Sequence, residues 1–480
     1  MNVVSWGWRR ATQALNWMTR RAQEASSQAE PSARRYIDVR IAAGLFESVR
    51  SHVEDPRRGE EAGFLLCSLS RLDAGDVLLV REWHPIPDMA IRRRANGSVL
   101  SWTADFNSDI LQRALDLDAS PVLVHSHGGP APTFSSDDRA KERPLFAGFS
   151  GILGQVPTGS LLLGRGCATG SFWMQGQSDE LAFRRLVVVG STIELWPAVP
   201  RRSPSPARRR LDRQTIAIGP ESDRKLAEAV VAVVGVSGGG SHVFQQLTHQ
   251  GVGTLIPIDD QLLEETNLGR HVGARRADVD RLHKTAISRR LANDVDPLLG
   301  VREVTARFPS EAAITALKSA DVIVTCLDRF DARAAVNSFC RRYLIPLVDV
   351  GMTIRTADEH LVRADGQVIV TLPGQPCLRC FFLTDATLEA ERRERPPGYD
   401  DNPDAPGQPQ VVSMNGVLAS EACNCVLDLL TGYSGGSRGA GWWQYDGRTG
   451  QLTPSELPSA RPGCPACSEE GLGDPPAMLG

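Results

Sequence analysis

The stretch between Val230 and Gly251 constrains the fold of this chain more than any other part of the sequence. The apolar run VVAVVG reads as a strand buried on both faces, which is typical of a parallel sheet. A tight glycine turn, GVSGGGS, follows it, and HVFQQLTHQG then has the pattern of a helix that stops at a glycine. This succession predicts the βαβ opening of an α/β fold with a doubly wound, mostly parallel sheet.

The same turn indicates where an anionic ligand would bind. Backbone amides at the start of a helix bind phosphate, and a carboxylate at the end of the next strand, here Asp259, can hold the hydroxyls of a ribose. A nicotinamide-dependent dehydrogenase would use these features equally well. The turn alone therefore predicts a nucleotide site without naming its reaction.

Length and local composition divide the chain. Its 480 residues predict about two or three domains. The segment PRRSPSPARRR is rich in proline, serine and arginine and lacks apolar periodicity, as a linker does. We predict a helical or flexible amino-terminal segment (1–35), a first domain (36–198), a linker (199–210) and the domain of the glycine turn (211–480).

Charge and hydropathy limit the partners. The chain has 53 Lys and Arg against 57 Asp and Glu, so its net charge of −4 gives no reason to expect nucleic acid or an anionic membrane. Its apolar runs are far shorter than the ~20 residues of a membrane-spanning helix, and no signal-peptide cleavage pattern follows the start. We expect a cytoplasmic protein. The Trp- and Arg-containing amino terminus could lie on a membrane or a partner, but a docked helix or a frayed end is the simpler interpretation.

Strand and helix patterns alternate in the first domain. We expect helices over 41–53 and 106–116 and strands over 62–69, 76–83 and 121–127, which together make a compact α/β or α+β domain. The last of these strands runs directly into a pair of histidines.

His125 and His127 are two residues apart on a strand end, so their side chains point to the same side and can ligate one ion. A catalytic zinc site uses three protein ligands and leaves a position for water, and Asp138 can complete such a set. The reaction also needs a general base. Glu60 or Glu61, just before the strand at 62–69, could serve if that strand is a neighbour.

The series of His125, His127, Ser135 and Asp138 is similar in spacing to the JAMM motif of the MPN metalloprotease family, which cleaves peptide or isopeptide bonds after ubiquitin-like proteins. The family glutamate precedes a glycine by three residues, as Glu60 does. The resemblance implies a catalytic zinc on His125, His127 and Asp138. It also implies Glu60 as general acid and base, and Ser135 as hydrogen-bond donor to the oxyanion. A hydrated loop with unrelated histidines is the alternative.

The residues after the glycine turn argue against hydride transfer. TNLGRH, Lys284 and CLDRFDARAAVN resemble the ThiF/MoeB and ubiquitin-activating adenylation family, and this resemblance implies ATP and magnesium as cofactors. The implied site comprises Gly235, Gly238, Gly240, Asp259, Asn267, Arg270, Lys284 and Asp328. The resemblance also implies a homodimer in which Arg213 reaches the ATP of the opposite subunit.

Three positions depart from the family pattern. Ser237 replaces a glycine of the turn, which costs little only if its φ stays negative. His271 stands where the family has glutamine, and Gln261 where a further aspartate is usual. These departures put the nucleotide geometry in doubt more than the fold.

Four of the 10 cysteines form two CxxC pairs. Cys377, Cys380, Cys464 and Cys467 fit a closed structural zinc site, and the resemblance implies that the distant pairs meet. A redox-active CxxC is the rival interpretation.

A thioester cysteine is missing from the place where self-loading relatives carry one. The segment ERRERPPGYDDNPDAPGQPQ contains none, and its proline and glycine content suggests a loop that orders around a carrier tail. The remaining candidates, Cys326, Cys340, Cys423 and Cys425, read as core residues. We expect the acyl-adenylate to pass directly to a partner, as in the sulfur-carrier branch, or to a conjugating enzyme.

The two resemblances together suggest a bifunctional enzyme. One domain would adenylate the carboxyl terminus of a ubiquitin-like protein, and the other would cleave after that protein, in a bacterial-type conjugation pathway. A flexible tether would raise the effective concentration of both sites on a shared carrier. The alternatives are activation and processing of a sulfur-carrier protein for cofactor or cysteine synthesis, and a carrier-binding scaffold with a degenerate site.

Overall fold

The structure is a computed structural model and describes residues 35–54, 61–93, 99–127, 132–176, 180–198, 209–395 and 409–475. The chain forms two compact units. Unit 1 comprises Met1–Val189, Glu194–Arg202 and Gly471–Gly480, and unit 2 comprises Gly190–Ile193 and Ser203–Glu470. The predicted amino-terminal segment and most of the predicted linker, residues 1–34 and 199–208, lie outside the described residues.

Unit 1 is built on a sheet that closes on itself. Its strands are β1 (Tyr36–Ala42), β2 (Ala62–Arg71), β3 (Gly75–Pro85), β6 (Ser120–Ser126), β7 (Thr158–Leu163), β8 (Ala168–Trp173), β9 (Leu181–Val189) and β10 (Ile193–Pro197). The order β1-β3-β2-β6-β7-β8-β9 returns to β1 through a β1–β9 pairing, and β10 continues from β9. The result is a closed barrel with both parallel and antiparallel pairs.

Three helices pack on this sheet, and unit 1 also has a small separate sheet. The helices are α2 (Ala43–Val53), α3 (Ala104–Leu117) and α4 (Ser136–Leu153), and the small sheet pairs β4 (Ile91–Arg93) with β5 (Val99–Trp102). Helix α2 packs against the interior apolar cluster, and α3 and α4 pack against the outer face of the sheet. The predicted first helix is shorter than expected, because residues 36–42 form β1 instead. The other strands and the helix predicted in this region are present.

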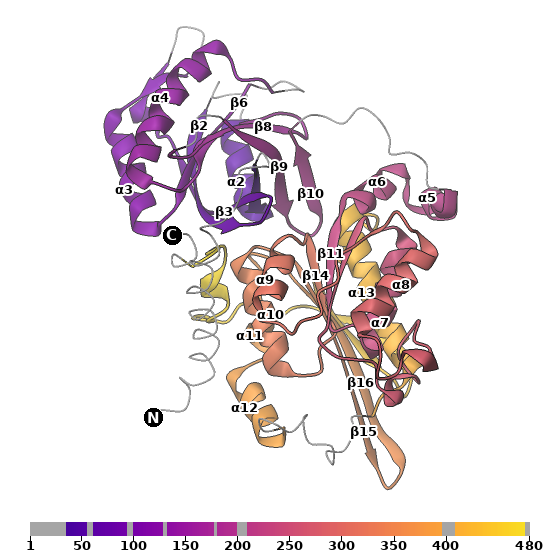
Figure 1. The fold of residues 1–480 in the computed structure, drawn as a ribbon. Helices are drawn as coiled ribbons and strands as arrows, with labels where there is room; N and C mark the ends of the chain where they lie inside the picture. Colours follow the sequence, from indigo (N-terminus) through magenta and orange to yellow (C-terminus); the bar gives the residue numbers. More distant parts are fainter. Residues whose placement is uncertain are drawn as a thin grey trace. The chain divides into compact units, whose positions relative to one another are not determined.

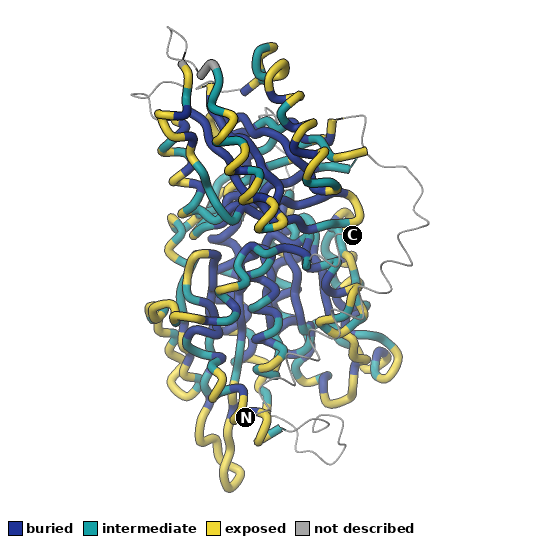
Figure 2. The backbone as a smooth tube through the Cα atoms, turned by 90° about the vertical axis from the view of Figure 1, so that its left-hand side faces the viewer, coloured by how far each residue is buried: buried dark blue, intermediate teal, exposed yellow. Residues whose placement is uncertain are grey.

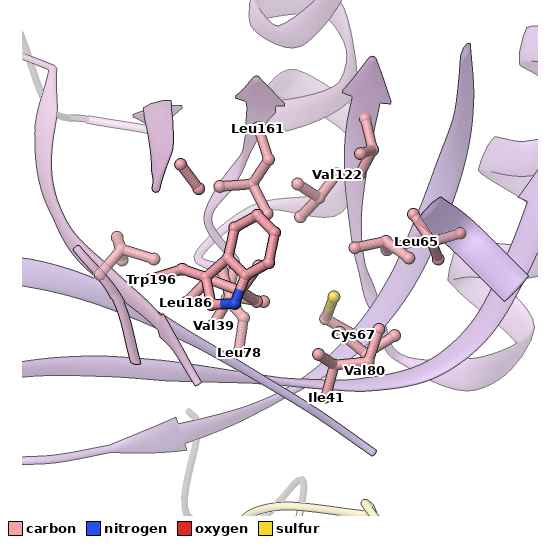
Figure 3. Packing of buried hydrophobic residues seen from close by; sticks show 14 of the residues in the cluster. Val39, Ile41, Leu65, Cys67, Leu78, Val80, Val122, Leu161, Leu186 and Trp196 are labelled. Carbon is pink, nitrogen blue, oxygen red and sulfur yellow. The ribbon is translucent and has the colours of Figure 1, made fainter. Parts of the chain in front are cut away.

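Two apolar clusters hold unit 1 together. The first fills the barrel, where side chains from β1, β2, β3, β6, β7 and β9 gather around the indole of Trp196 from β10 (Figure 3). The second lies between the outer face of β2 and β6 and the helices α3 and α4. Residues of β6 therefore alternate between the two clusters, with Val122 and Val124 facing inward and Leu123 facing the helices.

In unit 2, strands alternate with helices in the first, parallel part of the sheet, and the later strands pair antiparallel. Its strands are β11 (Val230–Val234), β12 (Thr254–Ile258), β13 (Gly300–Val301), β14 (Val322–Thr325), β15 (Leu347–Ala357), β16 (His360–Thr371), β17 (Gly441–Asp446) and β18 (Gln451–Ser455). Its helices are α5 (Asp212–Ile218), α6 (Pro220–Glu228), α7 (Gly238–Gln250), α8 (Lys284–Val295), α9 (Glu311–Lys318), α10 (Phe330–Arg342), α11 (Leu378–Phe381), α12 (Asp385–Glu394) and α13 (Val412–Thr431).

The sheet of unit 2 has the order β13-β12-β11-β14-β15-β16-β17-β18. Pairs from β13 to β15 are parallel, and pairs from β15 to β18 are antiparallel. Helices α7, α8 and α13 lie on one face, and α9 and α10 on the other (Figure 1). The predicted Rossmann-like, doubly wound sheet is confirmed, but it is mixed rather than mostly parallel over its whole width.

The pattern of buried and exposed residues agrees with the fold of each unit. The strands are largely buried, while the outer turns of the helices and the tip of the β15–β16 hairpin are exposed (Figure 2). Among the described residues, no helix is long and apolar enough to cross a membrane.

The segment after residue 470 belongs to unit 1, although the sequence predicted it with the carboxyl-terminal domain. The amide of Asp474 donates to the Leu69 carbonyl (2.8 Å), and its carboxylate accepts from the Arg71 amide (2.8 Å). Gly473 has φ +63°, and a Cβ there would meet the Leu69 carbonyl oxygen at 2.4 Å. This segment is thus fixed to the edge of β2.

Candidate functional site

The two histidines of unit 1 come together with Asp138. His125 lies on β6 with the parity of Leu123 and therefore faces α4. Nε2 of His127 lies 3.4 Å from Oδ2 of Asp138, and Nε2 of His125 lies 3.9 Å from Oδ1. We call His125, His127 and Asp138 the histidine cluster.

The geometry of the histidine cluster fits a metal ion. One potential ligand atom from each residue lies within 4.8 Å of the others. Metal–ligand bonds of about 2 Å in a tetrahedron place ligand atoms about 3.3 Å apart, so small adjustments would complete the set. Both ring nitrogens of His125 are buried without a hydrogen-bond partner, which is costly unless a ligand occupies them.

Ser135 caps helix α4 and thereby positions Asp138. The Ser135 hydroxyl donates to Oδ2 of Asp138 (2.7 Å) and accepts from its backbone amide (3.1 Å). The amide of Ser135 also donates to Oδ2 (2.7 Å), which completes a capping box. Burial raises the pKa of the Asp138 carboxyl. The opposing effects of His125 and of the Ser135 hydrogen bonds are larger together, so this pKa lies well below its usual range. The carboxylate is therefore ionised, as a metal ligand must be.

Glu142 is a part of this site that the sequence analysis missed. Its Oε1 lies 3.9 Å from Nδ1 of His125, and its Oε2 accepts from the Ser160 hydroxyl of β7 (2.5 Å). Burial raises the pKa of Glu142. Glu142 lies four residues after Asp138 in the same helix, and this spacing could have placed both carboxylates on one helix face from the sequence. Carboxylates commonly orient metal-bound histidines in this way.

Glu60, the predicted general base, lies outside the described residues. Its neighbour Glu61 is buried, and its Oε2 lies 3.8 Å from Nε2 of His52 on α2. Because α2 packs on the interior cluster whereas His125 faces α4, Glu61 is on the other face of β2. The contacts of Glu61 therefore do not support it as the base, and the assignment to Glu60 stays a prediction.

In unit 2 the glycine turn Gly235–Ser241 has the close approaches that require glycine. Gly235 has φ +83°, and a Cβ on Gly240 would lie 1.8 Å from the Gly235 carbonyl oxygen. Ser237 has φ −90°, so serine is accommodated there without the strain of a positive φ. A Cβ on Gly238 would meet the amide nitrogen of Asn415 at 2.9 Å.

Asp259 follows β12 and contacts the glycine turn, and Lys284 is the first residue of α8. The Asp259 carboxylate accepts from the amides of Val236 (3.0 Å) and Gln261 (3.0 Å), and burial raises its pKa. Lys284 is buried, and its Nζ donates to Oε1 of Gln261 (2.6 Å). Gln261, the departure from the family aspartate, therefore holds the ammonium group in place. Burial lowers the pKa of Lys284.

The TNLGRH segment lies beside the turn. Asn267 is buried, and its Oδ1 accepts from the Glu264 amide (3.3 Å), while Nη1 of Arg270 donates to the Thr266 carbonyl (3.0 Å). The Arg270 side chain lies 3.4 Å from the Cβ position of Gly238. His271 is buried with Nδ1 3.0 Å from the Val272 carbonyl, and burial lowers its pKa to about 4.

Asp328 follows β14 and is paired with an arginine that the sequence analysis did not single out. Nη2 of Arg395 donates to Oδ2 of Asp328 (3.1 Å). Next to Gly238, the side-chain amide of Asn415 donates from Nδ2 to Oε1 of Gln410 (3.0 Å). The sequence analysis predicted neither residue as part of the site. No local pattern marks these contacts, because they join segments far apart in the chain. Most of the loop predicted to order around a carrier tail, residues 396–408, lies outside the described residues.

Arg213 is exposed on α5 and lies away from the glycine turn of its own chain. The neighbouring Gln214 donates to the carbonyl of Gln250 (2.9 Å), the last residue of α7. The glycine turn leads into the opposite end of that helix, whose 13 residues span about 20 Å. Arg213 is thus not assembled with the other predicted nucleotide ligands within one chain.

The four CxxC cysteines meet in one cluster, which we call the tetracysteine cluster. Sulfur–sulfur distances are 3.9 Å for Cys377–Cys380, 3.7 Å for Cys377–Cys464 and 3.6 Å for Cys380–Cys467. A tetrahedral zinc with bonds of ~2.3 Å places its sulfurs about 3.8 Å apart, whereas a disulfide would be ~2.05 Å. The distances and the convergence of four sulfurs fit a structural zinc site better than two separate redox pairs.

The other six cysteines are unsuited to thioester formation. Cys67, Cys167, Cys340, Cys423 and Cys425 are buried, and Cys326 is half-buried. Burial raises the pKa of the Cys326 thiol to about 12 and raises those of Cys423 and Cys425 further. A reactive thiolate needs exposure and a lowered pKa, and none of these six has both.

Fold and geometry define unit 2 as a nucleotide-binding α/β domain with an attached tetracysteine cluster. The ThiF family model matches residues 211–466, and the chain belongs to the ThiF family, whose E1-like adenylation domain occupies its carboxyl-terminal half. The match begins at residue 211, so the JAMM resemblance of residues 36–198 rests on those residues alone.

Two curated relatives and one solved structure illustrate the similarity. The SAMP-activating enzyme E1 of Haloferax volcanii is 32% identical over 165 residues, which are 34% of this chain and 57% of that protein. The sulfur carrier protein ThiS adenylyltransferase of Escherichia coli K12 is 28% identical over 250 residues, 52% of this chain and 89% of that protein. The chain thus spans little more than half of the archaeal relative. The crystal structure of E. coli MccB with succinimide covers 54% of this chain and 75% of its own, at 21% identity and a TM-score of 0.45.

Proposed function

We propose that unit 2 uses ATP to adenylate the carboxyl terminus of a small ubiquitin-like or sulfur-carrier protein. One observation carries the proposal. The glycine turn after β11, Asp259 after β12 and Asp328 after β14 all follow the carboxyl ends of neighbouring parallel strands. Ligands of open α/β sheets bind at that edge.

The residues divide the work of adenylation by their chemistry. Amides at the start of α7 would hold phosphate, Asp259 would accept from ribose hydroxyls, and Lys284 with Arg270 would offset phosphate charge. Asp328 would hold magnesium, which when bound neutralises the triphosphate. A carrier carboxylate oxygen then attacks the α-phosphorus, and pyrophosphate leaves with the electrons of the broken P–O bond. Positioning and charge, rather than a covalent enzyme intermediate, account for such a reaction.

The transfer that follows is proposed to be direct. None of the six cysteines outside the tetracysteine cluster suits a thioester, so the acyl-adenylate would be handed to a sulfur donor or to a conjugating enzyme. The E. coli relative is a sulfur carrier protein adenylyltransferase, which favours the sulfur-carrier alternative over the conjugation pathway. A thiocarboxylate mass on the carrier would identify the first route, and an isopeptide-linked product the second.

The test of adenylation is ATP–pyrophosphate exchange. The full chain, with magnesium and a carrier ending in glycine, should catalyse exchange, and Asp328→Ala should abolish it. Asp294→Ala removes an exposed carboxylate on α8 that pairs with Arg275 at 3.9 Å, and it should leave exchange unchanged. No exchange with carriers of either kind would instead favour the scaffold alternative.

We also propose that unit 2 acts as a homodimer. Arg213 stands at the far end of α7 from its own glycine turn, and it would serve the site of a second copy. Mixing Arg213→Ala with Asp328→Ala subunits should restore part of the exchange that each variant lacks, because one mixed site keeps both residues.

For unit 1 we propose a second function, a zinc hydrolase that cleaves after the same carrier. The histidine cluster supports it, since two imidazoles and an ionised carboxylate converge on one point. Zinc bound there would activate a water molecule. Glu60 would move the proton, and Ser135, now hydrogen-bonded to Asp138, would have to turn toward substrate to donate to the oxyanion.

Cleavage of a carrier fusion with a carboxyl-terminal extension tests this second function. Glu60→Gln should abolish cleavage and leave pyrophosphate exchange intact, whereas Asp328→Ala should do the reverse. Glu47→Gln, which changes an exposed glutamate on α2, is the matched control. A variant that loses both activities together would contradict two independent sites.

A further inference from the structure

Asp328, the proposed magnesium ligand, already has a cation in contact with it. Arg395, immediately after α12, donates from Nη2 to Oδ2 of Asp328 at 3.1 Å and from Nη1 to its carbonyl at 3.5 Å. The Arg395 side chain is 14% exposed and that of Asp328 66%. The arginine is therefore packed in place, while the carboxylate stays open to a ligand from solvent.

The end of α12 is held on the Asp328 segment by contacts other than this ion pair. Glu391 is buried, and its carboxylate accepts from the amides of Phe330 (2.7 Å) and Asp331 (3.1 Å) in the first turn of α10. Nη2 of Arg329 also donates to the Arg395 carbonyl (3.4 Å). An anion at a helix start is a stable contact, so α12 stays attached if the ion pair opens.

We propose that Arg395 is a resident counter-ion of Asp328 that a divalent cation must displace. The inference rests on the proposed function of Asp328. A guanidinium group and a metal ion compete for the lone pairs of one carboxylate and repel each other at short range. Arg395 therefore weakens the binding of a free cation, and the phosphates of a nucleotide supply the extra ligands that favour displacement. The site accordingly takes its cation together with ATP rather than before it.

Manganese(II), whose binding is measured by electron paramagnetic resonance, tests this role in the full chain. Titrations would use a non-hydrolysable ATP analogue and compare the unmodified chain with R395M, R393M and D328N. R395M should bind manganese about 2- to 5-fold more tightly, the factor that an exposed ion pair of ~0.4–1 kcal/mol gives. R393M removes the same charge from the same helix, where Arg393 pairs with Glu389 at 2.7 Å, and should not differ from the unmodified chain.

Hydrogen exchange of the last turn of α12 provides a second readout. The Arg395 amide donates to the Glu391 carbonyl at 2.7 Å, so it reports whether this turn is closed. Because the Glu391 contacts remain when the ion pair opens, exchange of this amide should stay slow in R395M and in the unmodified chain with manganese and the analogue. Faster exchange in R395M would mean that the substitution unfolds the turn, and tighter manganese binding could then not be assigned to loss of the counter-ion.

The outcomes separate the two proposals. Binding that D328N abolishes but that R395M leaves unchanged or weakens would overturn the counter-ion role alone and leave the magnesium site standing. Manganese binding that D328N does not affect would overturn both, because Asp328 would then not be the cation ligand.

Discussion

His271, which follows Arg270 in the TNLGRH segment, allows a quantitative test of how burial there affects stability. Its ring is buried, and with Nδ1 3.0 Å from the Val272 carbonyl the neutral ring must carry its proton on Nδ1. Burial lowers the pKa of His271 from its ordinary 6.5 to about 4. The substitution His271→Gln introduces the residue that the family resemblance leads one to expect, and it removes the titrating imidazole.

The sign of the effect follows from proton binding. Between pH 6.5 and about 4 the unfolded chain takes up a proton that the folded unit does not. The contribution of His271 is therefore fully present above pH 6.5 and is lost as pH falls toward about 4. The pKa falls from 6.5 to about 4, and each pKa unit corresponds to about 1.36 kcal/mol. The free energy of unfolding should therefore change by at most about 3 kcal/mol over this pH range.

Urea unfolding of the full chain would be measured between pH 4 and 7.5, and hydrogen exchange of peptides from β11 and α7 would monitor it. These peptides report on unit 2 separately, which matters because a protein of two units need not unfold in one step. The free energy of unfolding of unit 2 should fall less on acidification in His271→Gln than in the unmodified chain. Equal pH dependence in both proteins would refute the burial argument, as would an NMR titration of His271 near 6.5.

Gly240→Ala should destabilise unit 2 by roughly 1–3 kcal/mol in thermal unfolding, because its Cβ overlaps the Gly235 carbonyl, whereas Gly239→Ala, with open space around its Cβ, should not. Asp474→Ala should cost unit 1 about 1–3 kcal/mol by leaving the Arg71 amide without its acceptor, and an unchanged midpoint would count against the anchoring role. Arg341→Met removes a guanidinium 3.5 Å from the tetracysteine cluster and should weaken zinc about 10- to 100-fold in chelator competition; retained affinity would mean that the contact is incidental.

The fold of unit 2 was predictable because its signals are local. The apolar run at 230–235 became β11, and the stop at Gly251 became the end of α7. The start of α7 was missed, since the helix already begins at Gly238 among glycines, which have poor helix propensity. Packing decided that start, because a Cβ on Gly240 would collide with the preceding turn.

In unit 1 the missed features are long-range. The closure of β1 on β9 joins Tyr36 to Ala182, and the anchor from Asp474 to Arg71 spans 403 residues. A hydrophobic pattern identifies which segments are strands, but it carries no information about distant pairing. The ligands of the histidine cluster were predictable from spacing, whereas Glu142 depended on which helix covers β6.

Helix α10 offers a physical reason for a tetracysteine cluster in an adenylation domain. Near one end, Oδ1 of Asn337 accepts from the Leu378 amide inside the first CxxC pair (3.0 Å), and Arg341 donates to Cys467. At the other end, Glu391 of α12 caps the helix start next to Asp328. Because α11 contains Cys380 and α12 follows it directly, a metal bound in the cluster would fix both helices beside α10 and the Asp328 segment. The order of the proposed cation site would thus depend on a metal that does not touch it.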